Sequence, residues 1–115
     1  MTKESDLCRG WTASDIRAAL ADASETQRAV VATIAANPHT TTAEIADELG
    51  WSSHRNVRST LAAFSQTTRA LGVTDRAGKL SWPFEIEESR PGSNFCRYYM
   101  PPAATEVVFK YLGGK

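Results

Sequence analysis

The amino-acid sequence predicts a mainly helical α+β fold with four helices, a β-hairpin and a C-terminal helix. Its 115 residues are the usual length of one domain, and 42% of them are apolar, enough for a packed core. Before residue 80 the apolar residues recur at the helical period, and after it they alternate with polar residues, as in a strand. The first ten residues are polar and aperiodic. We therefore expect a flexible tail over residues 1–10 and a single folded domain over residues 11–115.

Capping residues predict the first two helices. Thr12 or Ser14 can accept a hydrogen bond from a free backbone N–H in the first turn of a helix that ends near residue 23. Residues 24–27, with the sequence SETQ, match a capping box, in which the serine and glutamine side chains each satisfy an unpaired backbone amide. A second helix follows this box. It ends at Asn37, because Pro38 disfavours helical geometry in the residue before it.

Two further helices are predicted on either side of Gly50. The threonines at residues 40–42 can cap a short helix over residues 43–49, and Gly50 ends that helix. The next helix, the longest in the chain, covers about residues 53–71 and ends at Gly72. Its inward residues recur at steps of four, three, four and three, and they are Val57, Leu61, Phe64, Thr68 and Leu71.

The last part of the chain predicts a hairpin and a terminal helix. The apolar residues of the outgoing strand alternate with polar ones, and they are Leu80, Trp82, Phe84 and Ile86. Turn-forming residues follow at positions 90–94, and residues 95–100 return as the partner strand. Pro101 and Pro102 then open a helix, since proline is favoured in the first helical turn.

The two helices that flank Gly50 have the pattern of a helix-turn-helix. Ala46 is small enough to let the helices approach, and Gly50 supplies the backbone conformation that the turn needs. Residues 40–100, about half of the chain, resemble the winged helix-turn-helix domains of bacterial transcription regulators. The resemblance implies a DNA-binding fold with the helix over residues 53–71 as recognition helix. Val57 departs from the family pattern, because it lies seven positions after Gly50 where the family usually has six.

The aromatic residues of the hairpin carry a second resemblance. Trp82, Pro83 and Phe84, taken with residues 98–101 (YYMP), are similar to a group of small actinobacterial winged-helix proteins. This resemblance implies no particular DNA target.

The charged residues are unevenly distributed, although the formal net charge is zero. Residues 1–51 hold four basic and eight acidic residues, whereas residues 52–79 hold five basic residues and one acidic residue. No acidic residue occurs between Glu48 and Asp75. The middle of the chain is therefore basic, which indicates an affinity for negative charge.

The outer face of the predicted recognition helix is basic and polar. With about 100° of rotation per residue, its members fall opposite the inward stripe, and they are Arg55, Arg58, Ser59, Ala62, Gln66 and Arg69. Arginine can bind guanine, and glutamine or asparagine can bind adenine, through paired hydrogen bonds in the major groove. We expect Arg55, Arg58 and Ser59 to read bases. A solvated face usually mixes in acidic residues, and this one has none.

Other residues are candidates for contacts around this helix. Hydroxyls and free amides at helix N-termini can hold phosphate, so we give positioning roles to Thr41, Thr42, Ser52 and Ser53. Asn56 is a further candidate on the helix, and His54 is either a DNA contact or a surface residue. In the hairpin the candidates for a minor-groove contact are Arg90, Ser93, Asn94 and Arg97. Three glutamates on the outgoing strand would have to point away from DNA.

The sequence therefore predicts specific binding of double-stranded DNA, by a transcription regulator or an accessory DNA-recognition protein. The alternative is a winged-helix adaptor that binds a protein through exposed apolar surface such as Trp82 or Tyr98. A homodimer is also expected through the first and last helices, unless Ile16, Leu20, Val108 and Leu112 close the core instead.

Catalysis, metals and cofactors are not predicted. The sequence holds no nucleophile, phosphate-loop or metal-ligand spacing, and its two cysteines, Cys8 and Cys96, have the separation of ordinary thiols. No apolar run approaches the roughly 20 residues of a membrane span. We expect a cytoplasmic, nucleoid-associated protein.

Overall fold

The computed structural model describes residues 7–8, 10–74, 78, 81–88 and 96–113, with the backbone alone at Glu88 and Cys96. Within these residues the chain forms five helices: α1 (Ala13–Asp22), α2 (Glu25–Ala36), α3 (Thr42–Leu49), α4 (His54–Leu71) and α5 (Pro102–Leu112). Three short strands form an antiparallel sheet: β1 (Thr40–Thr41), β2 (Glu85–Glu88) and β3 (Cys96–Tyr99). The prediction of a mainly helical α+β fold is confirmed.

Reciprocal side-chain caps fix the start of three helices. At α1 the Thr12 hydroxyl accepts a hydrogen bond from the backbone N–H of Asp15, whose carboxylate accepts the backbone N–H of Thr12. The same exchange begins α2 and α3, where it joins Ser24 with Gln27 and Thr41 with Glu44. Each exchange satisfies two amides that the helix itself leaves unpaired. The capping box predicted at residues 24–27 is therefore confirmed.

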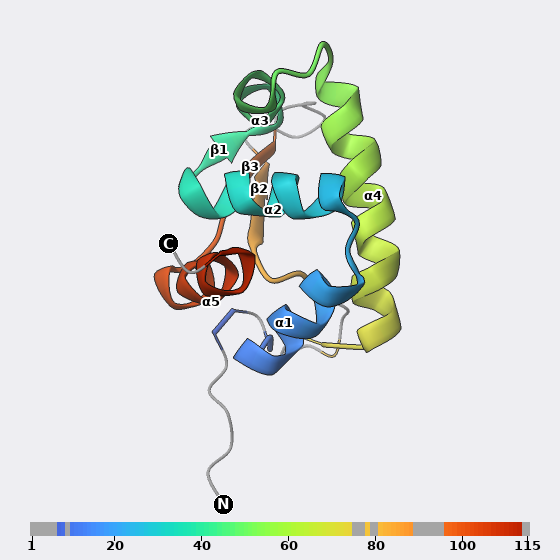
Figure 1. Cartoon of the computed structure of the whole chain (residues 1–115), viewed down its shortest axis with the longest axis vertical. Helices are drawn as coiled ribbons and strands as arrows, with labels where there is room; N and C mark the ends of the chain where they lie inside the picture. The colour runs from blue at the N-terminus through green and yellow to red at the C-terminus, as the bar shows by residue number, and fades with distance from the viewer. Residues whose placement is uncertain (1–6, 9, 75–77, 79–80, 89–95, 114–115) are drawn as a thin grey trace, which may run out of the picture.

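The helix α2 packs against three of the other helices, α3, α4 and α5. In Figure 1, α4 runs along one side of the molecule, where α1, α2 and α3 cover its inner face. The predicted inward stripe of α4 lies in this contact: Leu71 is half-buried, and the buried residues are Val57, Leu61, Phe64 and Thr68. The opposite face of α4 is exposed along the helix.

The sheet has the order β1-β3-β2. Its middle strand places Tyr98 opposite Thr40 on one side and opposite Ile86 on the other. The sequence did not predict β1, a strand of two residues whose partner lies 58 positions away along the chain. His39 directly precedes β1 and has a left-handed backbone conformation, with a φ angle of 61°.

The outgoing strand of the hairpin begins later than its alternating pattern predicted. Residues 81–84 have no strand pairing, and β2 starts at Glu85. Ser81 and Pro83, which alternate with the apolar residues of the predicted strand, are buried together with Phe84. The indole N–H of Trp11 donates a hydrogen bond of 3.0 Å to the Ser81 hydroxyl, which explains why this polar side chain is inside. Leu80 lies outside the described residues.

The chain is already packed before the predicted start of the domain. Cys8 is buried, and Leu7 packs against the core. The backbone N–H of Leu7 donates to the carbonyl of Trp11, and the N–H of Trp11 donates to the carbonyl of Cys8. Leu7 and Cys8, which belong to the expected tail, are therefore hydrogen-bonded to Trp11 and packed against the core. Residues 1–6 and 9 lie outside the described residues.

The apolar residues of α1 and α5 lie mainly inside the single chain. The two helices pack against each other, Ile16, Leu20 and Val108 are buried, and Leu112 is half-buried. Of the two readings that the sequence left open for these residues, closure of the core fits their burial. No helix within the described residues has the length and apolar character needed to cross a membrane.

Candidate nucleic-acid interface

The turn between α3 and α4 accommodates the extra residue before Val57. Gly50 has a φ angle of 72°, a left-handed conformation that glycine adopts without strain. The backbone N–H of Trp51 then donates to the carbonyl of Ala46, which closes the end of α3. Ser52 and Ser53 follow, and α4 begins at His54, so that Val57 still reaches the core. Trp51 is half-buried against the core, as a cap or core residue would be.

The outer face of α4 presents charged groups that have no partner in the described part of the chain. The three arginines are exposed, and none of their side chains makes a hydrogen bond or ion pair there: Arg55, Arg58 and Arg69. Ser59, Ala62 and Gln66 are exposed between them. Since α4 contains no acidic residue, nothing on the helix itself neutralises this face.

The first turn of α4 is open to an anion. The Ser53 hydroxyl accepts a hydrogen bond from the backbone N–H of Arg55, and no acidic residue lies in this turn. Unpaired amides and the helix dipole make such a terminus favourable for negative charge. Ser52, His54 and Asn56 are exposed around it, so the structure brings these candidates together with Arg55.

The first turn of α3, which we predicted to hold phosphate, already binds a carboxylate of the chain itself. The Thr41 hydroxyl is engaged by the backbone N–H of Glu44, and the Glu44 carboxylate lies 2.8 Å from the backbone N of Thr41. These hydrogen bonds from Thr41 hold the pKa of Glu44 below its ordinary value. A carboxylate thus already occupies this helix terminus.

Thr42 is not available for the phosphate contact that we predicted. Its side chain is buried, and its hydroxyl lies 3.2 Å from the phenol oxygen of Tyr98. The prediction placed it at a helix N-terminus, which is correct, but the aromatic strand residue that covers the hydroxyl comes from 56 positions further along the chain.

A shallow pocket of about 380 Å³ flanks the open terminus of α4. It lies between the start of α2 and the first two turns of α4, and it is lined by Thr26, Trp51, Asn56, Ser59 and Thr60. Two of the predicted contact residues, Asn56 and Ser59, therefore share a concave surface beside the arginines. The sequence pattern gave no sign of this concavity, because it depends on the packing of α2 against α4.

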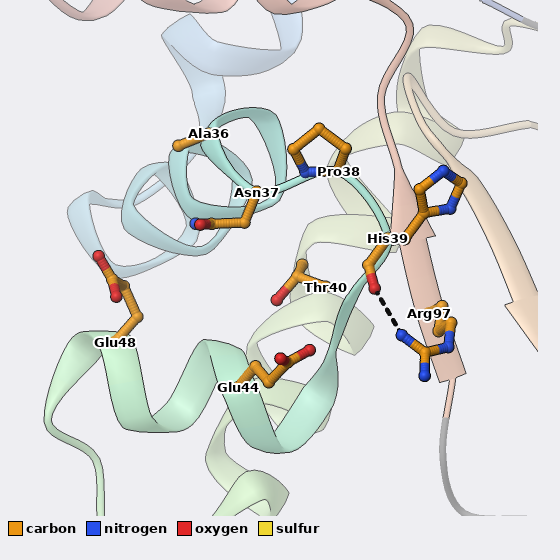
Figure 2. A pocket seen from close by; sticks show the side chains of 8 residues that line it. All are labelled: Ala36, Asn37, Pro38, His39, Thr40, Glu44, Glu48 and Arg97. Atoms are coloured by element: carbon orange, nitrogen blue, oxygen red, sulfur yellow. Dashed lines mark hydrogen bonds between the residues drawn. The ribbon is translucent and has the colours of Figure 1, made fainter.

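Of the four predicted contact residues in the hairpin, the structure describes only Arg97. Arg90, Ser93 and Asn94 lie outside the described residues. Arg97 is exposed on β3, but its guanidinium donates a hydrogen bond of 3.1 Å to the backbone carbonyl of His39. Arg97 lines a pocket of about 460 Å³ together with Glu44 and Glu48 of α3. The side chains that line this pocket are drawn in Figure 2. Arg97 therefore has a backbone partner and lies near enough to Glu44 to lower the pKa of that carboxyl further, so a contact with the minor groove stays a prediction.

His39 joins the hairpin to β1, and sequence reasoning did not identify it. Its ring stacks on Tyr99 with 4.8 Å between the centroids, and its Nδ1 atom lies 3.1 Å from a carboxylate oxygen of Glu87. Together with the bond from Arg97, these contacts hold the left-handed backbone of His39 in place. A single histidine before a threonine run carries no signal from which this role could be predicted.

The described residues contain no group of three or more histidine, cysteine or acidic side chains that could hold a metal ion. Comparisons of the chain with protein-family models, curated proteins and solved structures give no match.

Proposed function

We propose that this protein binds double-stranded DNA by inserting the exposed face of α4 into the major groove. The single observation that carries the proposal is the set of three exposed arginines on one face of a helix without acidic residues, none of which forms an ion pair in the described part of the chain. Exposed arginines that only solubilise a helix are normally accompanied by acidic residues one turn away. An α-helix of this kind fits the width of the major groove.

The arrangement of the elements supports the same proposal. The short helix α3, the glycine turn, the longer helix α4 and the hairpin β2–β3 occur in the order of the winged helix-turn-helix pattern that the sequence resembles. In that pattern α4 is the recognition helix. We infer that the fold is a winged helix-turn-helix and that the protein acts as a transcription regulator or an accessory DNA-recognition protein at the nucleoid.

The charges of α3 restrict how DNA can approach. Glu44, Asp47 and Glu48 are exposed on this helix, and the hydrogen bonds from Thr41 lower the pKa of Glu44, which favours its charged form further. Phosphates would be repelled from this side and attracted to the face of α4. The docking that fits this polarity places α4 in the groove and turns the outer face of α3 away from the backbone.

The burial of two aromatic residues favours DNA binding over the adaptor alternative. An adaptor would bind a protein through exposed apolar surface such as Trp82 or Tyr98, but Tyr98 is buried and Trp82 is half-buried against Phe84. The large apolar side chains that are exposed in the described part of the chain are Ile86 and Tyr111, each with 38% of its surface accessible. Two such residues on separate elements are ordinary for a protein surface.

The test is selection of bound duplexes from a random DNA pool, followed by fluorescence anisotropy on the enriched duplex at several salt concentrations. The Arg55→Ala/Arg58→Ala variant should lose binding. A matched variant, Arg17→Ala/Lys110→Ala, removes two exposed cations from α1 and α5 and should bind like the unaltered protein. If the two variants bind equally, or if the unaltered protein retains no duplex at low salt, α4 is not a DNA-reading helix.

A further inference from the structure

We propose that α4 reads three positions along the major groove: guanine at Arg58, the methyl group of thymine at Ala62, and adenine at Gln66. The positions follow in this order and are about one base pair apart. This inference rests on the proposed function, because it specifies which bases the exposed face of α4 recognises. It begins with the spacing of these three residues on the helix.

Arg58, Ala62 and Gln66 lie one above another at intervals of four residues, and all three are exposed. Four residues rise by about 6 Å along a helix. Because a helix in the major groove lies oblique to the DNA axis, residues three or four positions apart contact successive bases, so each interval covers about one base pair. The rotation from Arg58 to Gln66 is about 80°, which keeps both on one face of the helix. The elements α1, α2 and α3 pack against the opposite stripe and leave this line uncovered.

The lengths of the side chains match the shape of the groove. A straight helix comes closest to the base edges near the middle of its contact, because the groove curves away from it on both sides. Along α4 the middle position is Ala62, with only a methyl group, whereas long side chains flank it at Arg58 and Gln66. Ser59 and Ala63, the neighbours nearest to Ala62 on the exposed surface, are also small. The helix backbone can therefore approach the bases closely at its middle and reach them with longer side chains toward its ends.

The chemistry of each side chain assigns its base. Arginine pairs with O6 and N7 of guanine, and glutamine pairs with N6 and N7 of adenine, each through two hydrogen bonds. Alanine has no hydrogen-bonding group, and its apolar partner in the major groove is the C5-methyl of thymine. The side chains of Arg58 and Gln66 form no hydrogen bond within the described residues, so neither has to give up a partner on binding.

The test uses chemically altered duplexes built on the sequence that the random pool enriches. One duplex replaces the proposed thymine by uracil, which removes only the methyl group. Two others replace the proposed adenine or guanine by its 7-deaza analogue, which removes the N7 acceptor. We expect the unaltered protein to lose about fourfold in affinity without the methyl group, the value of one buried methyl. For each deaza analogue we expect a loss of about tenfold.

Each altered duplex has a matched protein variant. Ala62→Gly should no longer distinguish thymine from uracil, while still responding to the two deaza analogues. Gln66→Ala and Arg58→Ala should each become insensitive to their own analogue alone. Ala63→Gly makes the same substitution on the adjacent residue, with the same cost in helix stability, and should keep the full response to uracil. Circular dichroism establishes that each variant is folded.

The outcomes separate this inference from the proposed function. If no duplex is enriched, the proposed function itself fails. If duplexes are enriched but lack guanine, thymine and adenine in this order and spacing, the reading code is wrong although the protein binds DNA. The code is also overturned if Ala62→Gly and Ala63→Gly respond alike to uracil. Enrichment of the motif with position-specific loss in all three variants supports it.

Discussion

The hydroxyl of Thr42 lies 3.2 Å from the phenol oxygen of Tyr98, and both side chains are buried. This contact joins the first turn of α3 to the middle strand of the sheet, directly beside the pairing of Thr40 with Tyr98. The ring of Phe84 packs against Tyr98 edge to face, with centroids 6.0 Å apart. The hairpin is therefore attached to α3 through a buried polar contact inside an aromatic cluster.

Tyr98→Phe should destabilise the protein by about 1 kcal/mol, because the Thr42 hydroxyl is left buried without this partner. Urea denaturation measures the loss. The double variant Thr42→Val/Tyr98→Phe should recover part of it, since removing both polar groups leaves neither unsatisfied. If the double variant loses as much stability as Tyr98→Phe and Thr42→Val lose together, the two oxygens do not interact. Under conditions in which each variant is fully folded, its affinity for DNA should equal that of the unaltered protein.

Local chemistry determines most of the helix boundaries, which is why the sequence predicts them. Ser24, Gly50 and Gly72 each act on a backbone within a few residues of themselves, and the structure has a cap or a left-handed turn at each of them. The sheet is different, because it depends on distant pairing. β1 exists only against β3, and the burial of Ser81 depends on Trp11, 70 positions earlier. No periodicity within either segment contains this information.

The difference between local chemistry and distant pairing also explains which parts of the candidate site the sequence predicts. The exposed positions of Arg55, Arg58 and Arg69 follow from helical geometry once Val57 is known to face inward. Arg97 was predicted from its position in the hairpin, and the hairpin pattern did not reveal the hydrogen bond of its guanidinium to the carbonyl of His39. A residue on a long helix has its surroundings fixed by its own helix, whereas a residue on a short strand has them fixed by whatever pairs with it.

The carboxylate of Glu44 should titrate below the ordinary value of 4.5, because the backbone N–H and the hydroxyl of Thr41 stabilise its charged form. Since its pKa is lowered by folding, its contribution to stability is present above 4.5 and is lost as the pH falls through the lowered pKa. NMR titration of the carboxyl carbon measures the pKa, and Thr41→Ala should raise it. Glu44→Gln keeps the cap without a titrating group and should show less acid destabilisation than the unaltered protein. An unshifted pKa in the unaltered protein would contradict the capping box.

The side chain of Arg28 on α2 contacts both the end of α1 and α5. Its Nε atom donates a hydrogen bond of 2.8 Å to the carbonyl of Leu20, and its guanidinium lies 5.8 Å from the centre of the Tyr111 ring. Arg28→Ala should cost about 1 kcal/mol in the free energy of unfolding, because a C-terminal carbonyl of α1 loses a charged donor. Arg17→Ala, which removes an exposed arginine from α1, should cost less than about 0.5 kcal/mol. Equal losses in the two variants would mean that the contacts of Arg28 contribute nothing beyond a surface charge.

Arg69 lies almost one helical turn beyond Gln66 and should bind a phosphate instead of a base. The distance along α4 from Arg55 to Arg69 is roughly 21 Å, and at its far end a straight helix has left the floor of the curved groove. Arg69→Ala should therefore weaken binding equally for all sequences. It should reduce the slope of log affinity against log salt by about 0.9, the value for one phosphate contact.

The salt dependence of binding by Arg69→Ala, Arg58→Ala and Arg17→Ala distinguishes these roles. Arg17→Ala should leave both the slope and the enriched motif unchanged, because this residue lies on α1. Arg58→Ala should relax the motif at one position. If Arg69→Ala also changes the base preference at one position, Arg69 reads a base and the prediction of a phosphate contact is wrong. The groove contact of α4 would then extend as far as Arg69, which a straight helix in a curved groove does not reach.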